Sequence, residues 1–125
     1  RRQRQMCIET AYERIILFIE RIKPDSFIPR TLSPSLPYQE YQLLLINEIR
    51  KEFEYNLSQQ LYLSENAWEV TVNFKDNIIT LINSAATSCP PQATAGDLAR
   101  KILEHYISSD LKGEQILKIV KAEIQ

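Results

Sequence analysis

The fold depends on residues 64–89, which read SENAWEVTVNFKDNIITLINSAATSC. Trp68, Val70, Val72 and Phe74 alternate as in a half-buried strand, and residues 75–77 could form a hairpin turn. With a helical period, the same residues place apolar and small side chains on one stripe: Ala67, Thr71, Phe74, Ile78, Leu81, Ile82 and Ala85. Neither Gly nor Pro interrupts this segment, and Ser64 can cap a helix. We therefore expect a helix, with a β-hairpin over residues 68–82 as the alternative.

Helical periods also occur on both sides of this segment. Residues 8–22 carry apolar side chains three and four positions apart, and Pro24 ends that helix. Ile16 and Leu17 widen its apolar face, so we expect it to pack against more than one neighbour. A second helix is predicted over residues 38–59, and Thr94 with Asp97 resembles a capping box at the start of another.

Gly113 helps to mark a break, after which Leu117, Val120 and Ile124 predict a short amphipathic helix to the end of the chain. At 125 residues the chain has the length of one domain. The sequence thus predicts an all-α fold in a single domain over residues 1–125. This fold is a helical bundle of four main helices plus a short C-terminal helix.

Residues 24–37 hold four of the six prolines. Because proline interrupts helices, we expect an extended Pro-rich connection after the first helix. Such a connection is either a binding element or a crossover that lets two helices run parallel.

Charge and cysteine content exclude several classes of protein. The net charge is −1, so the chain has no overall attraction to nucleic acid. Arginines line the first helix, but Glu9, Glu13 and Glu20 interrupt them. Cys7 and Cys89 are too few for a disulfide scaffold, and we expect free thiols, with one bridge as the alternative.

The sequence lacks a set of residues typical of catalysis. His105 is the only histidine, and the two glycines cannot form a phosphate-binding loop. One histidine and two distant cysteines do not make a structural zinc site. We therefore expect no metal and no cofactor. A pocket near His105 or Cys89 is the basis of the alternative, a small ligand-binding or enzymatic helical domain.

The densest polar run lies between residues 52 and 64. One interpretation is structural: amides and hydroxyls satisfy backbone groups at a helix end. The other is an interaction surface, because tyrosine and tryptophan are enriched at protein interfaces. The residues of that surface are Glu52, Tyr55, Asn56, Gln59, Gln60, Tyr62 and Trp68.

Positive charge is concentrated in residues 1–5, where Arg1, Arg2 and Arg4 occur. Arginines in such a position are typical of the segment just cytoplasmic of a transmembrane helix. A solvated helix start is the alternative.

Several stretches resemble an uncharacterised family of membrane-anchored helical proteins from Bacteroidota-type bacteria. The resemblance is carried by residues 52–64 with Ala67-Trp68, by 82–86 and 93–96, and by 11–14 with 18–21. It extends to about Tyr106, and the β-prone residues 70–72 depart from it. The resemblance implies an N-terminal transmembrane helix, a basic linker that includes Arg1, Arg2 and Arg4, and a cytoplasmic helical domain. No activity is assigned to that family, so no catalytic residue is carried over.

Together these observations favour a non-enzymatic protein-interaction or scaffolding domain at the cytoplasmic face of a bacterial inner membrane. Its expected partner is another protein or a second copy of the chain. We expect no binding of nucleic acid or of a small molecule.

Overall fold

The structure is a computed structural model that describes residues 2–110 and 112–124. Within these residues all regular elements are helices, which confirms the predicted all-α bundle. The helices are α1 (Arg2–Ile22), α2 (Pro24–Thr31), α3 (Tyr38–Tyr55), the 3₁₀ helix η1 (Leu57–Tyr62), α4 (Glu65–Thr87), α5 (Ala95–Ser108) and α6 (Gly113–Ala122). The four long helices and the short C-terminal helix match the prediction, and α2 and η1 are additional short elements.

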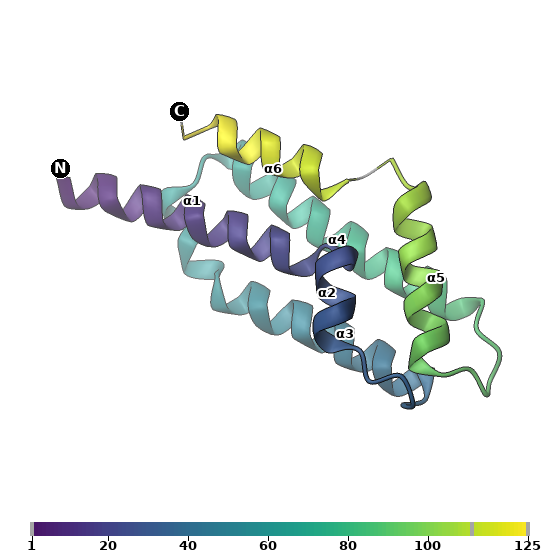
Figure 1. The fold of residues 1–125 in the computed structure, drawn as a ribbon. Coiled ribbons are helices and arrows are strands. Elements are labelled where there is room, and N and C mark those ends of the chain that lie inside the picture. Colours follow the sequence, from purple (N-terminus) through teal and green to yellow (C-terminus); the bar gives the residue numbers. More distant parts are fainter. Residues whose placement is uncertain (1, 111, 125) are drawn as a thin grey trace.

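Helices α1, α3, α4 and α6 run back and forth along one axis (Figure 1). Helix α3 runs antiparallel to α1, α4 returns beside them, and α6 runs back along α1 and α4. Helix α5 lies across the end of the bundle at which α4 ends. The start of α1 and the end of α6 therefore lie at the opposite end, where the first turns of α1 extend beyond the other helices.

Residues 65–87 form the helix α4, so the hairpin alternative is wrong. The Ser64 hydroxyl accepts a hydrogen bond from the Ala67 amide at 3.0 Å and caps this helix as predicted. Thr71, in the β-prone stretch, donates its buried hydroxyl to the Ala67 carbonyl at 2.7 Å. The helix is favoured over the hairpin because it buries a continuous stripe along its length, including Phe74 and Ile78.

Residues 24–31 form α2, so the predicted extended connection is wrong for this part. Pro24 occupies the first helical position, where its missing N–H has no intrahelical partner to lose. Phe27 and Ile28 are then buried in the bundle. The crossover interpretation is also wrong, because α1 and α3 run antiparallel. The remaining connection, residues 32–37, is joined to the start of α5 by hydrogen bonds from Tyr38 N to Ala93 O and from Ala95 N to Leu36 O.

Helix α3 ends at Tyr55, one turn before the predicted end at residue 59. The Asn56 side-chain amide donates to the Glu52 carbonyl at 2.8 Å, and the chain tightens into η1. This bond is the helix-end role that one interpretation of the polar run assigned to its amides. Further along, the Thr94–Asp97 capping box is present as predicted at the start of α5.

Candidate functional site: a groove between α1 and α3

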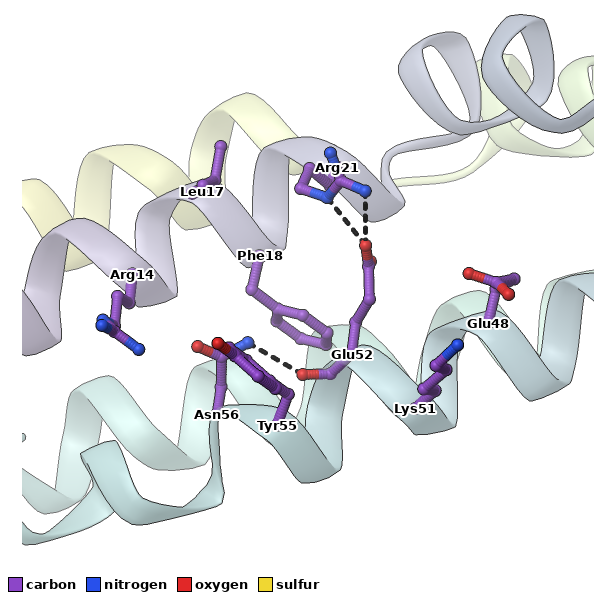
Figure 2. A pocket seen from close by; sticks show the side chains of 9 residues that line it. All are labelled: Arg14, Leu17, Phe18, Arg21, Glu48, Lys51, Glu52, Tyr55 and Asn56. Atoms are coloured by element: carbon purple, nitrogen blue, oxygen red, sulfur yellow. Dashed lines mark hydrogen bonds and ion pairs between the residues drawn. The ribbon is translucent and has the colours of Figure 1, made fainter.

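A groove of about 510 Å³ runs between α1 and α3 (Figure 2). Helix α1 supplies one wall, and the second half of α3 supplies the other. Its lining residues are Arg14, Leu17, Phe18, Arg21, Glu48, Lys51, Glu52, Tyr55 and Asn56. Arg14 lies near Tyr55 and Asn56 at one end, and Glu48 and Lys51 lie at the other (Figure 2).

The groove has an apolar floor and an apolar rim. Phe18 is buried and points towards α3, where its ring lies 6.0 Å from that of Phe53. Leu17 is 55% exposed and Tyr55 is 76% exposed. The prediction that Leu17 adds to the buried face of α1 is therefore wrong. One residue before Phe18 on a helix is about 100° around the axis, which turns Leu17 to the surface.

Charged side chains line both walls, and among the described residues only Arg21 and Glu52 form an ion pair in the groove. Arg21 Nε and Nη2 each lie 2.7 Å from Glu52 Oε1. The other carboxylate oxygen of Glu52 is buried and has no hydrogen-bond partner among the described residues. The side chains of Arg14, Lys51 and Glu48 form no ion pair within the described part of the chain. Two cations and one acid are thus left unpaired along the groove.

The predicted interaction residues are divided among three hollows. Glu52, Tyr55 and Asn56 line the groove itself. Gln59 and Tyr62 line a neighbouring hollow along the first half of α1, and Arg14 belongs to both. Gln60 and Trp68 line a separate hollow beside α4. The predicted surface is therefore not one site: five of its residues line hollows along α1, whereas Gln60 and Trp68 do not.

The basic and apolar residues of the groove were missed by the sequence interpretation. Arg14, Leu17 and Arg21 follow one another at spacings of three and four, as do the residues of the buried stripe. This second, mixed stripe was the available signal. Its arginines alone do not distinguish a solvated helix face from the wall of a groove.

The model of DUF7935, a family of unknown function, matches residues 7–125. The chain belongs to this family. No curated protein and no solved structure matches this chain. Membership of the DUF7935 family accords with the predicted resemblance to an uncharacterised family, and it brings no assigned reaction.

In this member of the DUF7935 family, His105 and Cys89 lie away from the groove. His105 is half-buried on α5. The buried Cys89 thiol lies 3.7 Å from the Ala85 carbonyl, and burial raises its pKa, which favours the unreactive thiol form. Cys7 and Cys89 are both free, as expected. The described residues contain no group of three or more His, Cys, Asp or Glu side chains placed to hold a metal ion.

The predicted membrane-proximal residues lie at the start of α1. Arg2 and Arg4 are exposed there, and Arg1 lies outside the described residues. Of the helices in the described part of this DUF7935 chain, none combines the length and the apolar character that crossing a bilayer requires.

Proposed function

We propose that the chain is a non-enzymatic protein-interaction domain that binds its partner through the groove between α1 and α3. The observation that carries this proposal is the exposure of Leu17 and Tyr55 on the rim, beside unpaired Arg14 and Lys51. Exposed apolar side chains grouped with tyrosine and arginine are typical of surfaces that a protein partner covers.

The chemistry of the groove supports binding over catalysis. Its nine lining residues include neither histidine nor cysteine. The acid at its centre, Glu52, is already paired with Arg21 at 2.7 Å. Glu48 is then the one carboxylate of the groove outside an ion pair among the described residues, and the lining offers it neither histidine nor cysteine as a catalytic partner.

We further propose that the domain works at the cytoplasmic face of a bacterial inner membrane. Exposed Arg2 and Arg4 support this location, because basic residues flank membrane anchors on the cytoplasmic side.

Photo-crosslinking in the native cell tests this function. A photoreactive amino acid replaces Tyr55 in the protein as the cell makes it, and a second variant carries it at Leu43. Leu43 is 63% exposed on the same helix but does not line the groove, so it serves as the matched control. We expect a discrete crosslinked protein from position 55 in the inner-membrane fraction, absent from position 43 and lost when Arg14→Glu is added.

Equal products from positions 55 and 43, or none from position 55, would contradict the interaction role. Recovery of the protein in the soluble fraction alone would contradict the membrane location and leave the interaction role standing.

A further inference from the structure

We propose that the occupant of the groove is an acidic amphipathic helix that lies lengthwise along α1. This inference rests on the proposed function and adds the chemistry of the partner. It begins with a stripe on α1 formed by Gln3, Cys7, Thr10, Arg14, Leu17 and Arg21. The spacings alternate between four and three, so these six side chains share one narrow face of the helix.

This stripe lines a continuous series of hollows. Arg14, Leu17 and Arg21 line the groove, while Gln3, Cys7, Thr10 and Arg14 line the neighbouring hollow. From Gln3 to Arg21 the helix rises about 27 Å, or roughly five turns. The opposite wall is formed by the end of α3 and by η1. A surface that is long, narrow and bounded by helices on both sides fits a rod-shaped occupant.

Exposed apolar side chains mark the same path. Leu17 and Tyr55 rim the groove, Met6 (61% exposed) lines the neighbouring hollow, and Leu61 (84% exposed) lines the next one. An occupant with an apolar stripe would remove them from water. This requirement selects an amphipathic helix over a wholly charged segment.

The charges of the groove indicate which residues should flank the apolar stripe of the occupant. Arg14 and Lys51 have no acidic partner in the described structure, whereas Glu48 is the one unpaired acid of the groove. Carboxylates on the occupant would pair with these cations. A second copy fits less well, because the α1 stripe holds Arg14 and Arg21 but no acid, and two such stripes would bring arginines together.

Two synthetic peptides of eighteen residues test the inference. Both carry the same leucine stripe and differ only in having glutamate or lysine on its flanks. Fluorescence anisotropy with the whole chain at physiological salt measures their Kd. We expect the glutamate peptide to bind about tenfold more tightly than the lysine peptide.

Charge reversal in the groove should invert this preference. Arg14→Glu weakens binding of the glutamate peptide about tenfold and strengthens binding of the lysine peptide. Arg50→Glu is the matched control, because Arg50 is an exposed α3 arginine outside the groove, and it should change neither value by more than about twofold. Circular dichroism checks that both variants are folded.

Equal affinity for the two peptides, or a preference for the lysine peptide, overturns the inference. So does Arg14-dependent binding to vesicles of 30% phosphatidylglycerol when neither peptide binds, since the groove would then be a lipid-binding surface. A concentration-dependent dimer that Arg14→Glu abolishes would identify a second copy as the occupant. If crosslinks from position 55 still reach a partner, the proposed function survives each of these results.

Discussion

Trp68 links the bundle core to the groove. Its ring stacks on Phe53 with centroids 5.4 Å apart and planes 26° from parallel. Phe53 in turn meets Phe18, which forms the groove floor. Lys75 Nζ lies 4.3 Å from the centre of the Phe53 ring. These contacts join α1, α3 and α4. The half-buried Trp68 ring thus packs against Phe53 and stabilises the α3 side of the groove.

Trp68→Ala should lower the free energy of unfolding by about 2 kcal/mol, less than for a fully buried tryptophan because the ring is only partly covered. Urea unfolding followed by circular dichroism measures this change. Tyr55→Ala is the matched control: its side chain is 76% exposed, so we expect a change below about 0.5 kcal/mol. Equal losses for the two variants would contradict the structural role assigned to Trp68.

At the scale of elements, the start of α4 is joined to two other helices. The Ser64 amide donates to the Tyr12 hydroxyl of α1 at 3.1 Å. The Ser64 hydroxyl accepts from Ala67 N and donates to Glu123 at 2.5 Å, just after α6. Asn66 donates to the second oxygen of the same carboxylate at 2.9 Å. The capping residue of α4 thus also fixes the position of the residue that follows α6.

Ser64→Ala should destabilise the domain by about 1 kcal/mol, because it removes the cap of a long helix together with the bond to Glu123. Thermal unfolding and urea titration measure this loss. Ser35→Ala provides the comparison, since Ser35 is exposed in a turn outside the helices and its loss should be close to neutral. A neutral Ser64→Ala variant would show that the cap contributes nothing.

The Glu123 carboxylate should make stability depend on pH. Hydrogen bonds from Ser64 and then from Asn66 lower its pKa in the folded chain. Because the pKa of Glu123 is lower in the folded chain than in the unfolded chain, the carboxylate stabilises the fold at pH values above the ordinary carboxyl pKa. This stabilisation is lost as the pH falls through the pKa of the folded chain. Unfolding of Glu123→Gln, measured between about pH 7 and pH 3, should show a smaller decline on acidification than the parent. An unchanged decline would exclude Glu123 as a contributor.

At the scale of the whole molecule, α6 closes the bundle through a close approach at Gly113. Its amide donates to the Tyr106 hydroxyl at 2.8 Å, and Lys23 forms an ion pair with Glu114 at 3.2 Å. A Cβ on Gly113 would lie 2.2 Å from Lys23 Cδ and 3.1 Å from the Tyr106 hydroxyl. The φ of Gly113 is not positive, so what favours glycine here is space and not backbone conformation.

Gly113→Ala should therefore destabilise the domain by about 1 kcal/mol, since Lys23 must move and its pair with Glu114 is lost. Gly96→Ala is the control: its nearest contact would be an ordinary 3.6 Å, so alanine in α5 should be neutral or slightly stabilising. Adding Lys23→Ala to Gly113→Ala should recover part of the loss in a double-mutant cycle. Equal effects of the two glycine substitutions would contradict the steric argument.

Local chemistry explains what could be predicted from the sequence. The capping groups of Ser64 and Thr94, and the buried stripes that include Ile15 and Phe74, depend on neighbours within one helix, so they can be read in sequence order. Pro24 ends the first helix as predicted, but it also begins α2, and this second role depends on the burial of Phe27 and Ile28 in the bundle.

The groove could not be predicted in the same way. Periodicity shows which residues share a face of α1, but not whether another helix covers that face. The packing of α1 against α3, η1, α4 and α6 leaves Arg14 and Leu17 uncovered. By itself the sequence therefore determined an all-α bundle with capped helices and few reactive groups. Only the tertiary structure decided where its mixed, unpaired surface lies, because exposure is a property of the whole packed molecule.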